Sequence, residues 1–347
     1  MQSPDFTLRT FLGACLLVVF SIGSWELYLR HLGFQPAYND EADFWAHERR
    51  KVYQAKDDAT VFIGSSRIKF DLDAETWMQE TGEQAIQLAC VGSTPLPVLH
   101  DLANDEKFKG KLIIDITEKL FFNFSPSPYS RPNDGIKYQK EESYAQKASY
   151  HIDWFLQTYL VFLDKENFTL NPMFGKLPVP KREGVMLPPS FPSGFERVNQ
   201  YRQSVITEAF AADTTETRKV KNIWKFFGEM GKKKPRPTAS QIDSLLSVVQ
   251  VDVQKLKSRG VDVVFTRTPS TGDEIAGENF AFPRALYWQR ILDTTQCKGI
   301  FFTDYPEMAA LDCPEYSHLD HSGAKIFTKK LIEILRNEHA WALKNQN

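Results

Sequence analysis

Val61-Phe62-Ile63-Gly64-Ser65-Ser66-Arg67 is an apolar run that ends on a glycine and two hydroxyl side chains. A short apolar run bounded by turn residues predicts a buried strand, so we expect a strand over residues 61–64 with a serine on the turn that follows. Near the C-terminus, Glu315-Tyr316-Ser317-His318-Leu319 places a carboxylate three residues before a histidine. A carboxylate at that spacing can orient the histidine as a base. The two stretches together predict nucleophilic serine chemistry.

Five apolar runs of this kind alternate with segments whose apolar residues recur every three or four positions. The runs predict strands over residues 61–64, 85–89, 112–117, 261–266 and 299–303. The periodic segments predict helices over residues 95–108, 239–259, 282–295 and 322–335, with Gly260 ending the second of them. Buried strands alternating with helices predict an α/β fold built on a doubly wound parallel sheet.

Residues from about 125 to 237 break this alternation. The stretch is rich in proline and aromatic residues, as in PSPYSRP and LPPSFPSGF, and its periodicity predicts helices near residues 144–163 and 195–225. It is interpreted as an insertion in a domain spanning residues 33–347. Two interpretations stay open, a cap or docking surface over one end of the sheet and an ordinary structural elaboration.

The first 32 residues differ from the rest of the chain. FLGACLLVVFSIGSW, over residues 11–25, contains no charge, and apolar residues continue past Glu26. Such a length is about the minimum that spans a bilayer. The segment ends in Trp25-Glu26-Leu27-Tyr28 without a small-x-small cleavage site, which favours an uncleaved signal anchor over a cleaved signal peptide or a buried helix.

The flanking charges do little to define the orientation of this anchor in the membrane. Arg9 lies on one side of the apolar segment and Arg30 on the other, so the positive charges are nearly balanced. A short tail before a large domain favours a domain outside the cytoplasm. We therefore expect a membrane-anchored, periplasmic domain.

The composition of the chain excludes few classes of protein. The chain has 347 residues, of which 42% are hydrophobic and 25% charged, as is usual for globular proteins. A net charge of −2 gives no electrostatic reason to expect a nucleic-acid partner. The short basic run at residues 232–236 is interpreted as a solvated loop.

The sequence predicts neither a metal site nor a cofactor. His318 and His321 are the only closely spaced histidines, and no cysteine pair lies near them. No glycine-rich loop of the phosphate-binding kind is present either. Cys297 and Cys313 flank the last predicted strand, where a disulfide in an oxidising compartment and two buried free thiols are equally plausible.

Chemistry-bearing residues follow each of the five predicted strands. In an open parallel sheet, ligands bind beyond the carboxyl ends of the strands, so these residues are expected to share one edge. In strand order they are Ser65-Ser66-Arg67, then Cys90-Val91-Gly92-Ser93, then Glu118-Lys119, then Arg267-Thr268-Pro269-Ser270, and finally Asp304, Asp312, Glu315 and His318.

Three of these blocks resemble those of the SGNH (GDSL-like) hydrolase superfamily, in particular its membrane-anchored branch that handles acyl groups on cell-envelope polymers. The resemblance implies a flavodoxin-like five-stranded parallel sheet. It implies that Ser66, in the Gly-Ser-Ser-Arg turn, is the nucleophile and that Gly92, in LACVGST, gives an amide to the oxyanion hole. In PEYSHLDHSGA it implies that Glu315 is the orienting acid and His318 the base.

The chain departs from that pattern in two places. The third block, LIIDITEKLFF, lacks the Gly-x-Asn-Asp whose asparagine is an oxyanion donor, so Thr117 or a backbone amide has to substitute. Loss of such a donor costs about 10²–10³ in rate. Glutamate also replaces aspartate at Glu315, with Asp312 as the reserve acid. Ile68 occupies the second glycine position of the competing Gly-x-Ser-x-Gly elbow and argues against it.

The remaining polar residues have weaker assignments. Arg67 and Arg267 are candidate substrate-binding cations, and for Arg67 pairing with a neighbouring acid is the alternative. His321 is interpreted as a helix N-terminal residue without a partner. Asp304 and Asp320 are interpreted as turn and cap residues.

The expected function is that of a serine-dependent acyl ester hydrolase or O-acyltransferase acting on a cell-envelope polysaccharide or glycan. The expected partners are the acylated glycan, the membrane and a multi-spanning membrane acyltransferase. A catalytically weak or inactive accessory protein that binds a glycan is the alternative, which the missing third block favours. A thioesterase or lipid esterase is a further possibility.

Overall fold

The computed structural model describes residues 4–54, 59–168, 170, 174, 189–232, 235–341 and 343. Its centre is a five-stranded sheet in the order β2-β1-β3-β6-β7, with every neighbouring pair parallel. The strands are β1 (Ala59–Ile63), β2 (Gln84–Gln87), β3 (Lys111–Asp115), β6 (Asp262–Arg267) and β7 (Lys298–Phe301). The predicted α/β class and five-stranded parallel sheet are confirmed.

The sheet is buried on both faces, as parallel sheets are. Every residue of β1 and β3 is buried, and their register places Val61 opposite Leu112 and Ile63 opposite Ile114. The observed strands lie within about two residues of the predicted ones, because a strand buried on both faces is a continuous apolar run.

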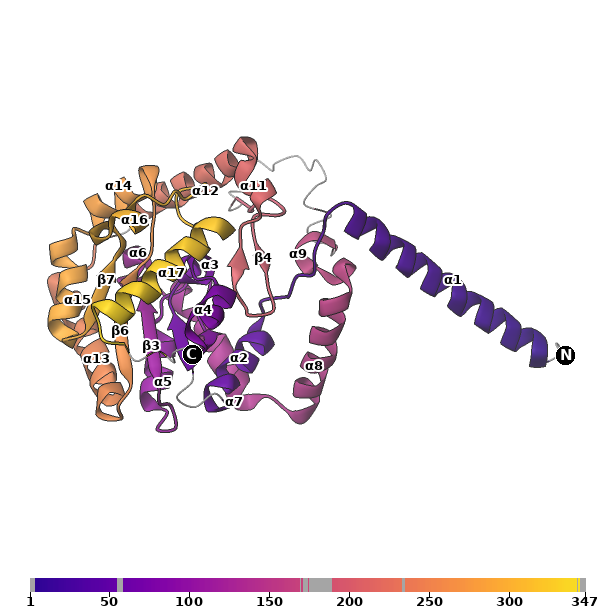
Figure 1. Cartoon of the computed structure of the whole chain (residues 1–347), viewed down its shortest axis with the longest axis horizontal. Helices are drawn as coiled ribbons and strands as arrows, with labels where there is room; N and C mark the ends of the chain where they lie inside the picture. Colours follow the sequence, from indigo (N-terminus) through magenta and orange to yellow (C-terminus); the bar gives the residue numbers. More distant parts are fainter. Residues whose placement is uncertain are drawn as a thin grey trace.

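Two groups of helices cover the sheet (Figure 1). One group, whose members contact one another, contains α5 (Leu96–Asn104), α13 (Ala239–Ser258) and α15 (Trp288–Thr295). The other contains α3 (Ser66–Asp71), α4 (Ala74–Thr81) and α17 (His321–Asn337). Right-handed crossovers place the helix after β1 on the opposite face from those after β2, β3 and β6, so the sheet is wound on both sides.

Local sequence explains where the long helices begin and end. Thr238 and Gln241 form a capping box at the start of α13, and Gly260, with φ of +81°, follows its end as predicted. Asp320 caps α17 by accepting from the Gly323 amide at 2.7 Å, which confirms its interpretation as a cap residue.

The helix predicted over residues 282–295 starts later than expected. Residues 284–286 form a short 3-10 turn and the α-helix begins at Trp288. Pro283 accounts for Phe282 lying outside the helix, because the residue before a proline avoids the helical region and Phe282 has φ of −131°. Tyr287, with φ of −126° and ψ of −70°, separates the 3-10 turn from the α-helix. An unpredicted helix, α14 (Gly272–Ala281), precedes this turn.

Between β3 and α13, residues 118–238 form a separate set of elements that we call the intervening segment. Its described elements of four residues or more are α6 (Glu118–Phe121), α7 (Ser130–Glu141), α8 (Tyr144–Tyr159), α9 (Lys165–Phe168), α11 (Glu208–Ala212) and α12 (Thr214–Lys232). Two short strands, β4 (Arg197–Val198) and β5 (Ser204–Val205), pair with each other in a separate sheet.

The helix predicted near residues 144–163 is confirmed by α8. The prediction near residues 195–225 is wrong over its first third, where β4 and β5 form a hairpin instead. The hairpin gains a tertiary partner that local periodicity does not reveal, since the Tyr38 amide donates to the Val198 carbonyl at 3.0 Å.

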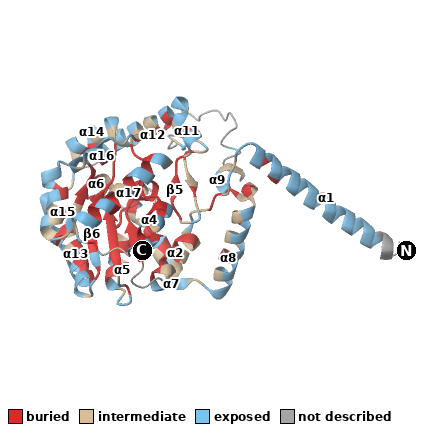
Figure 2. Cartoon of the chain, in the orientation of Figure 1, coloured by how far each residue is buried: buried red, intermediate tan, exposed pale blue. Residues whose placement is uncertain are grey.

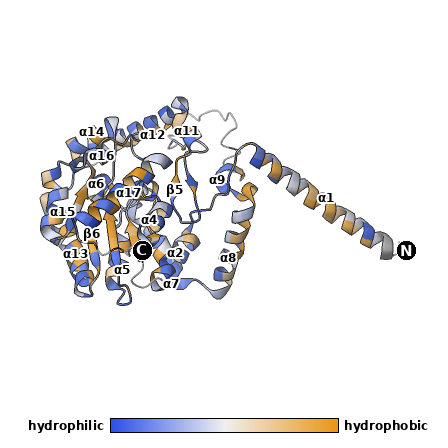
Figure 3. Cartoon of the chain, viewed as in Figure 1, coloured by the Kyte–Doolittle hydropathy of each residue, from blue (hydrophilic) through white to orange (hydrophobic). Residues whose placement is uncertain are grey.

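An N-terminal helix, α1 (Pro4–His31), projects from the domain (Figures 1 and 2). Within residues 7–31, an 18-residue apolar window has a mean hydropathy of 1.7, and only 11% of that window is buried. Apolar colouring runs along much of its length (Figure 3). The helix is long and apolar enough to be a membrane anchor or a signal sequence.

Cys297 and Cys313 are free thiols in this structure. Cys313 is buried, and burial raises the pKa of its thiol well above the usual value. The structure therefore agrees with the free thiols, and not with a disulfide between these two cysteines.

Candidate functional site

The turn after β1 presents Ser66 at the edge of the sheet. Gly64 is required there, because a Cβ at this position would lie 2.7 Å from Ile68 Cγ2 and 2.8 Å from Asp115 Cβ. Ser65 Oγ accepts from the Arg67 amide at 3.2 Å and caps α3. Ser66 is therefore the first residue of the helix. Its side chain is half-buried, and its amide has no acceptor within the helix.

Three residues form a continuous chain of hydrogen bonds at this edge. His318 Nε2 lies 2.9 Å from Ser66 Oγ, and His318 Nδ1 lies 2.8 Å from Glu315 Oε1. The ionised carboxylate only accepts, so Nδ1 carries the proton and Nε2 is left to accept from the serine hydroxyl. Glu315 is 0% exposed and His318 is 1% exposed, so the contact between them is sheltered from water, while the Ser66 end is only partly buried.

The loop that carries Glu315 and His318 is fixed from both sides. Tyr316 has φ of +81°, in the left-handed region that side chains other than glycine rarely adopt. Its carbonyl accepts from the Thr271 amide at 2.9 Å, and on the far side the Leu319 amide donates to Asp71 Oδ1 at 2.9 Å. These bonds hold the loop in a conformation that is unfavourable in isolation.

Three aromatic rings surround the His318 imidazole. The centroids of Phe70, Trp224 and Phe195 lie 4.4, 5.8 and 6.0 Å from that of His318. Trp224 Nε1 also donates a hydrogen bond to Glu315 Oε2, so both carboxylate oxygens have donors. None of these three residues could be assigned to the site from the sequence, because no spacing links Trp224 to an acid 91 positions later.

Gly92 and Thr117 lie on the loops after the two strands that flank β1. Gly92 is exposed with φ of +65°, and the stretch before it runs beside β1, with the Cys90 amide donating to the Gly64 carbonyl at 3.2 Å. Thr117 is buried, and its Oγ1 lies 2.7 Å from Ser65 Oγ. Its hydroxyl therefore stabilises the turn beside Ser66.

Arg67 and Arg267 form a buried ion-pair network with Glu278 of α14. Each guanidinium is 1% exposed, and Glu278 uses one carboxylate oxygen for each arginine. Burial alone would raise the pKa of Glu278, but the two positive charges hold it below its usual value. Arg67 therefore pairs with an acid, which is the alternative that the sequence left open for it. Arg267 is paired with an acid in the same way.

Lys119 and Glu274 extend this network toward the aromatic rings. Glu274 accepts from Lys119 Nζ and lies 3.4 Å from Arg67 Nη2, while Lys119 Nζ is 5.7 Å from the centroid of the Trp224 ring. The loops after β1 and β3, helix α14 and the intervening segment are thus linked beside the site.

Two further carboxyl groups are buried behind the Ser66 turn. Burial raises the pKa of Asp115 to about 6, although the charges of Arg67 and Arg267 act in the opposite direction. Burial also raises the pKa of Asp71 well above its usual value. Asp115 Oδ1 accepts from the Thr268 amide at 3.2 Å, so this acid connects the ends of β3 and β6.

Other sequence assignments have mixed outcomes. His321 is the first residue of α17, which confirms its interpretation as a helix N-terminal residue. It also has a partner, which was not expected, because its Nε2 lies 3.2 Å from Asp73 Oδ2. Asp304 pairs with Arg284 through both of its carboxylate oxygens. Asp312, the reserve acid, lies 3.5 Å from Thr271 Oγ1. Glu315 is the acid that bonds to the His318 imidazole.

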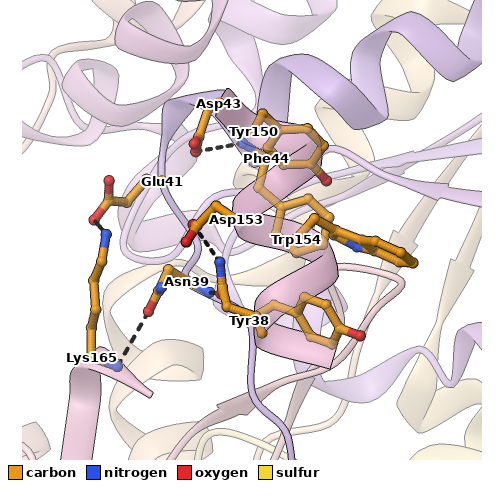
Figure 4. Close-up of a pocket in the computed structure, with 10 residues that line it drawn as sticks. Tyr38, Asn39, Glu41, Asp43, Phe44, Tyr150, Asp153, Trp154 and Lys165 are labelled. Atoms are coloured by element: carbon orange, nitrogen blue, oxygen red, sulfur yellow. Dashed lines mark hydrogen bonds and ion pairs between the residues drawn. The ribbon is translucent and has the colours of Figure 1, made fainter. Parts of the chain in front are cut away.

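Within the described ranges, no group of three or more His, Cys, Asp or Glu side chains is arranged to hold a metal ion. A pocket lies between α8 and the segment after α1, lined by residues that include Tyr38, Phe44 and Trp154 (Figure 4). Ser66 and His318 are not among its lining residues, so it is separate from the serine site.

No protein-family model matches this chain, and no curated protein was found to be similar to it. Functional inference therefore depends on the geometry of the site.

Proposed function

We propose that this chain is a serine-dependent acyl ester hydrolase or O-acyltransferase whose triad is Ser66, His318 and Glu315. One observation carries the proposal, the unbroken contact from Ser66 Oγ through both ring nitrogens of His318 to Glu315, with distances of 2.9 and 2.8 Å. A serine hydroxyl needs an adjacent base to act as a nucleophile, and that base needs an orienting acid. The fold is SGNH-like in this proposal, with residues from about 125 to 237 as its insertion.

In the first half-reaction, Ser66 Oγ attacks the carbonyl carbon of an acyl ester while His318 Nε2 takes the hydroxyl proton. The amides of Ser66 and Gly92 stabilise the oxyanion of the tetrahedral intermediate. The intermediate collapses as His318 returns the proton to the leaving alkoxide, and the acyl group stays on Ser66. Glu315 stays ionised and stabilises the transient imidazolium.

In the second half-reaction, a water molecule or a sugar hydroxyl attacks the acyl-serine. His318 takes the proton of the attacking oxygen and delivers it to Ser66 Oγ, which restores the enzyme. Water as acceptor gives hydrolysis, and a sugar hydroxyl gives acyl transfer. The rings of Phe70, Phe195 and Trp224 pack around the imidazole that serves both half-reactions.

The proposed substrate is an acylated cell-envelope polysaccharide or glycan. The resemblance of the Ser66, Gly92 and His318 blocks to the membrane-anchored SGNH branch supports this substrate class. Helix α1, which suits a membrane anchor, agrees with a domain held outside the cytoplasm near such polymers. A multi-spanning membrane acyltransferase would be the source of the acyl group.

The direct test is fluorophosphonate labelling and aryl acetate hydrolysis by the full-length protein in detergent. We expect covalent modification of the peptide that contains Ser66, and none in Ser66→Ala. Ser247→Ala is the control, because it removes an exposed hydroxyl on α13, away from the Ser66 turn, and should keep the label. Absence of labelling in a folded wild-type protein, together with no esterase activity, would refute the proposal.

A second candidate function is that of an accessory protein that binds a glycan without catalysis. The third loop favours it, because Thr117, the residue that would have to replace the asparagine donor of the superfamily, is buried with its Oγ1 2.7 Å from Ser65 Oγ. An accessory protein would keep its effect on polymer acylation in cells after Ser66→Ala, whereas an enzyme would lose it.

A further inference from the structure

Helix α8 carries an apolar stripe that no described part of the domain covers. Ile152, Phe155, Leu156 and Tyr159 are between 39% and 63% exposed. Their spacing of three and four residues places them on one side of the helix. Phe155 and Tyr159 contact each other, with ring centroids 5.0 Å apart.

The other side of α8 is fixed to the domain (Figure 4). The Tyr38 hydroxyl lies 2.9 Å from Thr158 Oγ1, and the Asn39 amide donates to Gln157 Oε1 at 2.8 Å. The rings of Tyr38 and Trp154 are 5.8 Å apart. Because these contacts set the rotation of the helix, the stripe is held outward.

The last turn of α1 is bonded to the C-terminal end of α8 and the residues just after it. Glu26 accepts from the amides of Val161 and Phe162 at 3.0 and 3.2 Å, and Arg30 Nη2 donates to the Tyr159 carbonyl at 2.9 Å. Leu29, which lies between Glu26 and Arg30 on this last part of α1, is 2% exposed. The end of the apolar helix and the end of the stripe therefore form one unit.

Aromatic residues mark where α1 would leave a bilayer. Trp25 and Tyr28 are half exposed, with ring centroids 5.7 Å apart, and such residues concentrate at the membrane interface. They lie within the last two turns of α1, next to the residues that bond to α8. Helix α8 lies on the side of the domain that faces α1 (Figures 1 and 3).

We propose that α8 lies on the surface of the lipid bilayer and that its stripe, Ile152, Phe155, Leu156 and Tyr159, enters the boundary between headgroups and acyl chains. An amphipathic helix binds a membrane in this way through its apolar side. This inference rests on the proposed role of α1 as an anchor. With α1 and α8 as two attachments, the domain keeps one orientation on the membrane, so Ser66 is held at one height above it.

The test is nitroxide accessibility of the full-length chain in vesicles of phosphatidylethanolamine and phosphatidylglycerol. The background carries Cys15→Ser and Cys297→Ser, and the reporters are Phe155→Cys and, independently, Ile152→Cys. Val248→Cys on α13 is the matched control, because Val248 is also an exposed apolar residue of a helix. Leu17→Cys, within α1, reports on the anchor itself.

We expect the ratio of collisions with oxygen to collisions with a water-soluble nickel chelate to be at least about threefold higher at the stripe than at Val248. A lipid-exposed label at Leu17 with water-exposed labels on α8 would overturn this inference and leave the anchor intact. Water-exposed labels at both sites would overturn the anchor as well. Stripe labels protected from both reagents would indicate a protein contact, such as a second copy, and would also overturn it.

Discussion

Ser66 and Arg67 are neighbours in the sequence and follow the same strand, but they belong to different kinds of polar cluster. The Ser66 hydroxyl is half-buried and bonds to His318 at the open end of a three-residue chain. The Arg67 guanidinium is 1% exposed and is enclosed by Glu278 and Glu274. Strand-end placement thus selects candidate residues, while burial and pairing decide which of them can reach a substrate.

The two clusters also differ in what they stabilise. The proposed triad holds one carboxylate and one imidazole in line with the Ser66 hydroxyl, at distances of 2.8 and 2.9 Å. The network holds two guanidinium groups against shared carboxylates away from water, and breaking such a group leaves uncompensated buried charge. We therefore expect changes in the network to act on folding and changes in the triad to act on catalysis.

The largest effect expected on stability is from Glu278→Gln. The variant leaves Arg67 and Arg267 without their shared carboxylate, so the free energy of unfolding should fall by about 3–5 kcal/mol in urea titrations near pH 7. Because the pKa of Glu278 lies below its usual 4.5, the wild-type advantage should shrink as pH falls below that value. Glu274→Gln, at a more exposed carboxylate, is the control and should cost less. Equal effects of the two substitutions would contradict the distinction between the clusters.

A smaller effect, opposite in its pH dependence, is expected from Asp115→Asn. Between its usual pKa of 3.8 and its folded value of about 6, the folded protein keeps a proton that the unfolded chain has lost. Wild-type stability should therefore fall as pH rises through that window, by about 3 kcal/mol relative to the variant. Urea titrations of both proteins at several pH values between about 3.5 and 7 measure this difference. A constant difference across the range would show that Asp115 is ionised in the fold.

The smallest effect is expected from Trp224→Phe, which keeps a ring beside His318 and removes the bond from Nε1 to Glu315 Oε2. Loss of one hydrogen bond to the orienting acid should lower kcat/KM toward an aryl acetate by about tenfold, with stability little changed. Phe227→Leu, one turn further along α12, is the control and should leave kcat/KM unchanged. A large loss of stability with unchanged kcat/KM would place Trp224 with the structural network instead.

The sequence predicted the elements whose signals are local. The sheet strands are short apolar runs, α13 begins at a capping box, and Gly260 marks its end, so each could be recognised from neighbouring residues alone. Helix α14 was missed because its helical pattern is short and its apolar residues are few. Its role in holding Arg67 depends on Glu278, 211 positions away, which no local pattern can indicate.

The parallel sheet could be predicted from the chain alone, as could the order in which Ser66, Gly92, Glu315 and His318 reach its edge, because the carboxyl ends of parallel strands coincide. The bond from Trp224 to Glu315, the ion pairs of Arg67 and Arg267, and the place of the α8 stripe beside the end of α1 became visible only in the folded molecule. These contacts join residues far apart in the chain. They depend on how whole elements pack, whereas periodicity and spacing report only what lies within a few residues.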